Sequence, residues 1–328
     1  MKKIIILVSL CTSLLLSSCH SNDSELLYGK YPEPLLIAVG VNPNVNKDYK
    51  ELTREDLKKV LNFHFIKMDD EGQPLEQYGF EDNKEYDFSI ILEMPNMTHL
   101  DIDLGREIRL KDYSILKKLH NLESLRIGNI TDKDIENIIG LNSLDSLSIV
   151  HSKITNIDFL KNLNQLDSFY LYDVPDVQNF NPLKYLKNVR AINIVNCDVS
   201  EVQLDTIPDM TTLQFMSLSV NNIKNIVKFP KMANLQYLSL VNNPLINFNI
   251  PSDTLPNLKS LTLDGTLITD ADNINGVDSI EMIYLFRTGI KRVAPLKKFK
   301  NLKTVYCDEN IIEDEEYMES LGINVDGE

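Results

Sequence analysis

Leu213-x-x-Met216-x-Leu218-x-x-Asn221-x-Ile223 and Leu235-x-x-Leu238-x-Leu240-x-x-Asn243-x-Leu245 are two copies of one apolar pattern, 22 residues apart. Further copies start at Met97, Leu122, Leu144, Leu166, Val189, Leu258, Ile280 and Leu302. Successive starts lie 22 to 25 residues apart. Ten copies in register at a period in the twenties predict a solenoid, in which each unit buries its apolar side against its neighbours.

Each copy is expected to open with a short strand, whose alternate residues face opposite sides. The inward positions are apolar and include Leu100/Ile102, Leu125/Ile127, Leu147/Ile149, Leu238/Leu240, Leu261/Leu263 and Ile283/Leu285. The pattern L-x-x-L-x-L-x-x-N/C-x-L at this period is the leucine-rich-repeat signature. The predicted fold class is therefore an α/β solenoid. It has a parallel β-sheet on its concave face, short helical or irregular convex segments, and a cap at each end.

One polar position follows three residues after the second inward strand residue. It is occupied by Asn221, Asn243, Asn310, Cys197, Ser152, Thr266 and Thr288 in different copies. A side chain that turns inward there can hydrogen-bond backbone groups that the bend leaves unpaired. Cys197 lies in this position and Cys307 at an inward strand position, five coils and about 24 Å apart by strand spacing. Both cysteines are therefore expected to be buried, free and inert.

The repeat resembles the internalin-type class of bacterial leucine-rich repeats, whose units of about 22 residues favour I-x-x-I-x-x-L-x-x-L-x-x-L after the Asn. Two segments match this back half: Ile154-x-x-Ile157-x-Phe159-Leu160-x-x-Leu163 and Ile290-x-x-Val293-x-Pro295-Leu296-x-x-Phe299. Residues Leu52 to Val60 resemble the helical cap that opens many such arrays. The resemblance covers roughly residues 50 to 325. It implies a protein partner, on a host cell or in the same envelope.

The first residues predict export. Met1-Lys2-Lys3 and an apolar run from Ile4 to Leu16 form a signal peptide that is too short to span a bilayer permanently. The run ends Leu16-Ser17-Ser18-Cys19, which resembles the bacterial lipoprotein box. This resemblance implies cleavage before Cys19 and lipidation of that cysteine; the alternative is ordinary secretion with an incidental cysteine. The expected location is the bacterial cell envelope, lipid-anchored, at the outer membrane or cell surface.

The repeat period also sets the expected domain boundaries. They are 1–18 for the lipoprotein signal peptide, 19–48 for a tether and irregular lead-in, 49–96 for an N-terminal cap with an acidic insertion, 97–312 for the repeats and 313–328 for a C-terminal cap. Apolar residues after Thr53 recur at helical spacing, but Val60-x-x-Phe63-x-Phe65 also fits a degenerate first strand. The acidic stretch 69–87 is interpreted as an inserted loop, either functional or a solvated connection.

Composition and motifs exclude several classes of function. The chain has 48 acidic and 33 basic residues, a net charge of −15 that becomes −17 once Lys2 and Lys3 are removed. This charge repels nucleic acid and anionic lipid headgroups, so membrane attachment must rest on the lipid anchor. No catalytic, metal-binding or nucleotide-binding motif occurs. We therefore predict no enzymatic activity, no cofactor and no metal, and we interpret His99, Asp101 and Asp103 as a solvated strand face.

The outward strand positions hold the candidate site. Seven of them are aromatic: Tyr170, Tyr172, Phe215, Tyr237, Tyr284, Phe286 and Tyr306. Aromatic residues among small serines are typical of an adaptable binding face, although aromatic residues are also good strand formers. Phe215 and Tyr237 occupy one outward column on adjacent strands, so their side chains should lie side by side.

These residues predict a non-catalytic protein-binding module, for adhesion or recognition, that acts through its concave face. The alternative is a glycan-binding accessory lipoprotein of a nutrient-uptake system, in which Tyr and Phe stack on sugar rings. A broad shallow aromatic patch favours a protein partner. One narrow pocket, with aromatic residues and flanking acids, favours a glycan.

Overall fold

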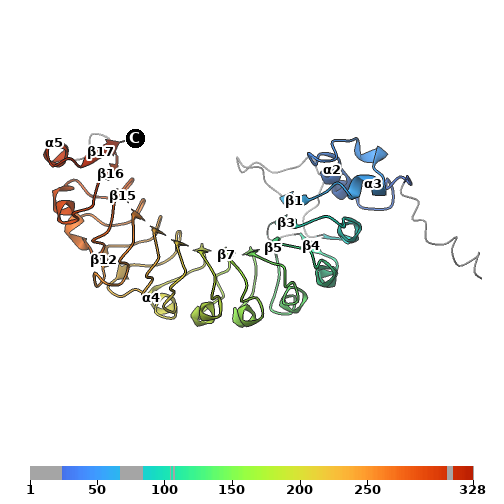
Figure 1. Cartoon of the computed structure of the whole chain (residues 1–328), viewed down its shortest axis with the longest axis horizontal. Coiled ribbons are helices and arrows are strands. Elements are labelled where there is room, and N and C mark those ends of the chain that lie inside the picture. The colour runs from blue at the N-terminus through green and yellow to red at the C-terminus, as the bar shows by residue number, and fades with distance from the viewer. Residues whose placement is uncertain (1–23, 67–83, 104, 106–107, 309–312, 328) are drawn as a thin grey trace, which may run out of the picture.

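The computed structural model describes residues 24–66, 84–103, 105, 108–308 and 313–327. Over these residues the coils form one arc, with a parallel sheet along its concave side and short helices along its convex side (Figure 1). The predicted leucine-rich-repeat solenoid is confirmed. The signal peptide, Cys19, Asn310 and most of the acidic stretch 69–87 lie outside the described residues.

The concave sheet contains twelve parallel strands within the described residues. In chain order they are β1 (Asn62–Ile66), β3 (His99–Asp103), β5 (Ser124–Gly128), β6 (Ser146–Val150), β7 (Ser168–Tyr172), β8 (Ala191–Val195), β9 (Phe215–Ser217), β11 (Tyr237–Ser239), β13 (Ser260–Thr262), β15 (Met282–Tyr284), β16 (Thr304–Cys307) and β17 (Asn324–Gly327). Equivalent positions of successive copies are direct partners, such as Leu125 with Leu147 and Leu238 with Leu261. One repeat in sequence is therefore one strand in the sheet.

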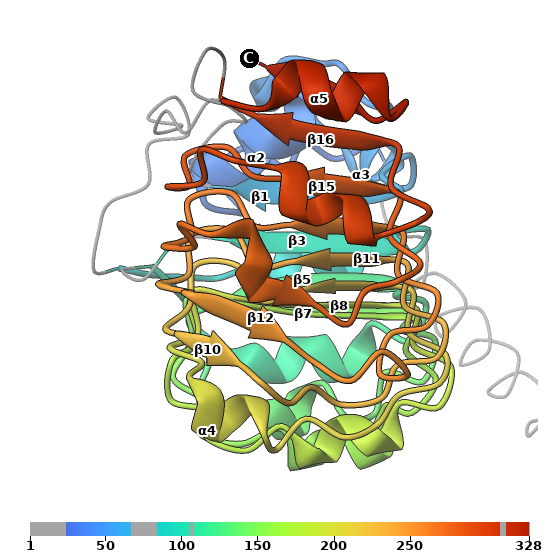
Figure 2. The same ribbon diagram turned by 90° about the vertical axis from the view of Figure 1, so that its left-hand side faces the viewer.

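The convex side changes along the array. It carries mostly one- or two-turn helices: η3 (Ser89–Glu93), η4 (Tyr113–Lys118), η5 (Ile135–Asn137), η6 (Asp158–Asn162), η7 (Asn181–Tyr185), α4 (Glu201–Leu204), η8 (Ala271–Asn273) and η9 (Ala294–Lys298). After α4, extended segments also form a small second sheet of β10 (Asn225–Ile226), β12 (Asn247–Asn249) and β14 (Ile274–Asn275), two strands of which are labelled in Figure 2. Among the described helices, none has the length and apolar character needed to cross a membrane.

One continuous apolar core runs inside the arc. All the inward residue pairs predicted from the repeats are at most 2% exposed. Convex residues such as Phe180 and Phe248 are also fully buried and close the core from the other side. The two cysteines Cys197 and Cys307 are free and buried, as predicted. Burial raises the pKa of Cys197 to about 12 and that of Cys307 to about 11, so neither forms a thiolate near neutral pH.

The polar residue after each strand hydrogen-bonds backbone groups at the bend, as its residue type predicted. Asn243 is 1% exposed, and its amide donates to the carbonyl groups of Leu218 and Leu240, both at 2.9 Å. Its Oδ1 accepts a hydrogen bond from the backbone N–H of Ile223. Asn221 bonds the preceding coil in the same way, because its Oδ1 accepts from Cys197 and Val199. Each amide therefore ties its own coil to the one before it.

Most coils also turn through a residue in the left-handed region just before this polar position. These residues are Asn129, His151, Asp173, Asn196, Val220, Asn242, Gly265 and Arg287. Gly, Asn and Asp tolerate a positive φ, whereas a β-branched side chain is strained there. Val220, with φ 56°, is the β-branched residue of this series. Its strain is a local cost that the repeat geometry imposes.

The N-terminal cap begins earlier than predicted. Helix α2 (Glu33–Gly40) lies where an irregular lead-in was expected, and it buries Leu35, Leu36 and Val39 completely. Its sequence is apolar on all sides, which removes the amphipathic period that marks a surface helix. A 3-10 turn, η1 (Tyr49–Glu51), follows it. Both interpretations of the next segment hold in part, because helix α3 (Arg54–Leu57) has a capping box from Thr53 and Asp56 and is followed by strand β1.

The acidic stretch and the C-terminal end give mixed outcomes. Interpreting 69–87 as one loop is wrong at its end, because β2 (Glu85–Tyr86) pairs with β4 (Arg109–Leu110). Backbone hydrogen bonds to β4, whose side chains gave no signal in the sequence, hold this segment. At the other end, helix α5 (Glu315–Ser320), Gly322 with φ 77° and strand β17 lie in the segment 313–328 that was expected to form a C-terminal cap.

Candidate functional site

The concave face is a grid of outward side chains with a fixed register. Its central row crosses the sheet one strand at a time: His64, Asp101, Arg126, Ser148, Tyr170, Asn193, Ser217, Ser239, Thr262, Tyr284, Tyr306 and Asp326. Large or charged side chains occupy both ends of this row, and small polar ones occupy the middle. The face therefore offers two separate regions.

The C-terminal region is aromatic. Phe215 on β9 and Tyr237 on β11 are register partners, and their rings stack with centroids 4.7 Å apart and planes 4° apart. Their residues remain 44% and 39% exposed. Tyr284 on β15 and Tyr306 on β16 form a second stack, with centroids 4.4 Å apart. The prediction that Phe215 and Tyr237 lie side by side is confirmed.

Asp264 lies next to the second stack. Its Oδ1 accepts a hydrogen bond from the backbone N–H of Phe286, which follows β15. Burial raises the pKa of Tyr284, and the neighbouring Tyr306 and Asp264 raise it further. The Tyr284 phenol therefore stays protonated at neutral pH and keeps an O–H donor at the rim of an apolar surface. Stacked rings with polar edges and free faces can bind another molecule by contact and hydrogen bonding.

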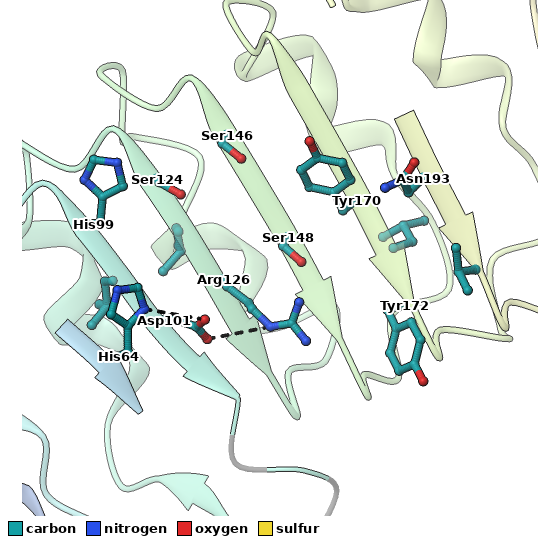
Figure 3. A pocket seen from close by; sticks show the side chains of 14 residues that line it. His64, His99, Asp101, Ser124, Arg126, Ser146, Ser148, Tyr170, Tyr172 and Asn193 are labelled. Carbon is teal, nitrogen blue, oxygen red and sulfur yellow. Dashed lines mark ion pairs between the residues drawn. The ribbon is translucent and has the colours of Figure 1, made fainter. Parts of the chain in front are cut away.

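The N-terminal region is a hollow of about 420 Å³ on the same face (Figure 3). Its floor consists of the small residues Ser124, Ser146 and Ser148 on β5 and β6. One wall is charged and the other aromatic: the charged wall carries His64, His99, Asp101 and Arg126, and the aromatic wall carries Tyr170, Tyr172 and Asn193. The hollow forms because the short serine side chains on β5 and β6 lie between strands that carry longer side chains.

The charged wall is part of a chain of ion pairs that crosses several coils. Arg126 donates from Nη2 to Asp103 at 2.6 Å, and its Nε lies 3.6 Å from Asp101 Oδ1. His151 Nε2 lies 3.7 Å from Asp103 Oδ1, and His151 Nδ1 lies 2.6 Å from Asp173 Oδ2. The left-handed turn at His151 places its ring between the two carboxylates. The Tyr172 ring packs edge-on against the His151 ring, with centroids 5.4 Å apart.

Asp101 is the least compensated member of this chain. Its side chain is 16% exposed, and its Oδ1 is buried and accepts no hydrogen bond from any described residue. Among the described residues, the His64 ring also lies near Asp101, with its Nδ1 3.8 Å from Oδ2. The pKa of Asp101 is raised to about 7, because burial raises it more than Arg126 lowers it and the neighbouring Asp103 adds to the rise. The carboxylate is therefore half-neutralised near pH 7.

The seven predicted site residues fall into three groups. Tyr170 and Tyr172 line the hollow, Phe215 pairs with Tyr237, and Tyr284 pairs with Tyr306. Phe286 lies beyond the end of β15 and is half-buried. Strand alternation places Val150 on the outward side of β6, but it is fully buried, because it pairs with Gly128 and fills the space that a side chain there would need.

Sequence reasoning missed the charged side of the hollow. Arg126 was placed outward without a role, and His64 and His151 were not connected with any site. The repeat register alone puts Asp101 opposite Arg126, so that contact was available from the sequence. His64 required knowing that β1 joins the sheet. The interpretation of His99, Asp101 and Asp103 as a solvated strand face is wrong for the two carboxylates, because Asp103 is 8% exposed and the side chain of Asp101 is 16% exposed. The described residues contain no group of three or more His, Cys, Asp or Glu side chains arranged to hold a metal ion.

The arc is similar to solved leucine-rich-repeat structures. An internalin (inlF) from Listeria monocytogenes is similar over 91% of this chain and 92% of its own, with 18% identity and a TM-score of 0.54. The TLR13 of a TLR13–ssRNA13 complex is similar over 72% of this chain and 36% of its own, with 19% identity and a TM-score of 0.56. No protein-family model and no curated protein matches the sequence. The likeness shows an internalin-like leucine-rich-repeat fold.

Proposed function

We propose that this chain is a non-catalytic recognition module of a bacterial cell envelope, which binds a protein partner through its concave face. The observation that carries the proposal is the pair of aromatic stacks on β9–β11 and β15–β16. Exposed rings leave apolar area in water, and such area on an open surface is typical of a site that a partner covers. A few aromatic side chains usually dominate the binding energy of such an interface.

The layout of the C-terminal region favours a protein over a small ligand. One strand, β13, separates the two stacks, and its register partners to Tyr237 and Tyr284 are the small residues Ser260 and Thr262. Small side chains between large rings leave a broad shallow surface with polar hydroxyl groups at its rim. Protein interfaces have this arrangement of an apolar centre and a polar rim.

A glycan is the second candidate, and the N-terminal hollow favours it. Tyr170 and Tyr172 stand opposite Asp101 across a floor of serine hydroxyl groups. Aromatic faces with nearby hydrogen-bonding side chains can hold a sugar ring. A glycan array probed with the full chain, and with a Tyr170→Ala, Tyr172→Ala variant, tests this function. Binding that the variant loses would support the glycan reading for this end of the face.

The protein-binding proposal is tested by photo-crosslinking from the face itself. A benzophenone amino acid replaces Tyr237 on the concave face or, as a control, the 72% exposed Val202 on convex helix α4. The proposal expects position 237 to capture a protein that also binds the purified chain directly. Capture from position 202 with none from position 237 would place the interface on the convex side.

The anchor is a separate part of the proposal, and it rests on the sequence Leu16-Ser17-Ser18-Cys19. The net charge of −15 repels anionic lipids, so the lipid on Cys19 would supply the attachment. Cys19→Ala should therefore move the protein from the membrane fraction to the soluble fraction. A Cys19→Ala variant that still sediments with membranes would contradict lipid anchoring.

A further inference from the structure

The hollow on β3–β8 has the size of a ligand site. Its volume of about 420 Å³ falls within the range of about 300 to 1,000 Å³ that small-molecule pockets occupy. Its serine floor sits low because the register partners Ser124 and Ser146 have short side chains. The flanking strands carry His99, Asp101 and Tyr170, which rise on either side. An extended side chain laid across β5 and β6 would contact both walls.

The carboxylate of Asp101, which lines the hollow, is incompletely paired. It shares one permanent cation, Arg126, with Asp103, which does not line the hollow. The guanidinium makes its short contact with Asp103, at 2.6 Å, and leaves Asp101 with a 3.6 Å contact. The Nδ1 atom of His64 lies 3.8 Å from Oδ2 of Asp101. A buried carboxylate without a close donor is unfavourable, and a second cation at this wall would relieve it.

The opposite wall suits a cation as well. Tyr170 is half-buried, Tyr172 is 42% exposed, and both rings border the hollow. The electron-rich face of a tyrosine ring attracts a cationic group, and a guanidinium can stack on it through its planar surface. The net charge of −15 also attracts a basic partner over longer distances. The shape of the hollow, its local charge and its aromatic wall therefore all favour a cationic side chain.

We propose that the hollow receives an arginine side chain of the partner protein, with its guanidinium beside Asp101 and its flat face against Tyr170. This inference rests on the proposed protein-binding function and adds the chemistry by which the partner is recognised. The planar guanidinium fits a carboxylate and an aromatic face together, which a compact ammonium does less well. The stacked rings at the C-terminal end would then serve apolar side chains of the same partner.

Saturation-transfer NMR on the full chain tests the hollow without a partner. The probes are acetyl-Gly-Arg-Gly-amide, its lysine analogue and its citrulline analogue, which keeps the shape of arginine but has no charge. We expect the arginine peptide to bind, with saturation transferred to its side-chain methylenes. The citrulline peptide should bind at least about tenfold more weakly, and salt should weaken the arginine peptide alone of these two. Equal binding of arginine and citrulline peptides would overturn the proposal.

Two pairs of variants place the binding in the hollow. Asp101→Asn should weaken the arginine peptide at least about tenfold, whereas Asp326→Asn, an exposed carboxylate at the far end of the same row, should leave it unchanged. Ser146→Gln fills the floor and should weaken it at least about fivefold, while Ser168→Gln on the next strand should not. Equal effects within either pair would contradict a site in the hollow.

Three outcomes separate this inference from the function on which it rests. If N-acetylglucosamine binds in the hollow and the arginine peptide does not, the arginine proposal is wrong and the glycan reading of this end gains support. If no probe binds but a captured partner still requires Tyr237 and Tyr284, the protein-binding function stands and the inference about the hollow fails. If the arginine peptide binds and substitution of Tyr237 and Tyr284 leaves partner binding unchanged, the arginine site is supported and the C-terminal surface is not the protein interface.

Discussion

Strands β3 to β7 and strands β9 to β16 carry different chemistry on one uniform backbone. In the first region, Asp101, Arg126 and Asp103 form a partly buried charge network beside a hollow. In the second region, Phe215 and Tyr237 form an exposed stack, and Tyr284 and Tyr306 form a half-buried one. The inward residues of both regions are mostly Leu, Ile and Val, and all are buried. The repeat therefore fixes the scaffold, while the outward residues remain free to specify what is bound.

The two regions also differ in their effect on the stability of the fold. Stacked aromatic residues stabilise the sheet even without a partner, because each ring buries part of the surface of the other. The charged region instead includes a carboxylate whose ionised form is disfavoured by burial. A residue that opposes folding in the free protein is typical of a functional site. The two ends of the face should therefore respond differently to pH, salt and substitution.

The largest expected effect concerns Asp101. Its folded pKa of about 7 lies above the ordinary value of 3.8, so ionisation weakens the folded state. The cost is absent below about pH 4, grows as pH rises toward 7 and is complete above it, reaching as much as about 4 kcal/mol. Asp101→Asn should therefore stabilise the protein at pH 8 and have little effect at pH 4. Urea unfolding at both pH values measures this, with exposed Asp326→Asn as the control; a pH-independent effect of Asp101→Asn would contradict the account.

The next effect tests whether both regions share one scaffold. Asn243→Ala should lower the free energy of unfolding by about 1–3 kcal/mol, because three backbone groups lose their buried partner. Ser152→Ala removes the equivalent contacts in the charged region, to Val150 and Ile130, and should also destabilise. Thr304→Ala on the outward face should stay within about 0.5 kcal/mol. Similar losses for Thr304→Ala and Asn243→Ala would refute the inward and outward assignment.

The smallest effect concerns the turn between the regions. Val220→Asn should stabilise the protein by about 1 kcal/mol, since asparagine tolerates the positive φ that strains valine. Asn242→Val, the reverse change one coil later, should destabilise by a similar amount. Thermal unfolding of the two variants gives the comparison directly. If both changes act in the same direction, backbone strain is not the reason for the residue preference at this turn.

The fold was predictable because the same spacing repeats ten times, and each copy predicts one strand and one bend. The aromatic stacks were predictable too, because strand alternation and register place Phe215 beside Tyr237. Helix α2 gave no such signal, since a helix that is apolar on every side has no amphipathic period.

The hollow was harder to predict from the residues. Its volume depends on the relative lengths of side chains on neighbouring strands, and the pKa of Asp101 depends on burial that no single segment encodes. His64 contributes because a degenerate strand joins the sheet, and His151 because a left-handed turn aims its ring at Asp173. The register would have revealed the contact between Asp101 and Arg126, but not that this contact is too long for a hydrogen bond.

The most direct test of the central claim is the affinity of the crosslinked partner for a double variant of the aromatic region. Tyr237→Ala with Tyr284→Ala should weaken binding by at least about 2 kcal/mol, roughly thirtyfold, while the melting curve shows an intact fold. Val202→Ala with Val227→Ala, two exposed positions outside the concave sheet, serves as the matched control and should leave the affinity unchanged. Unchanged affinity in the folded tyrosine variant, or an equal loss in the valine control, would show that the concave face is not the binding surface.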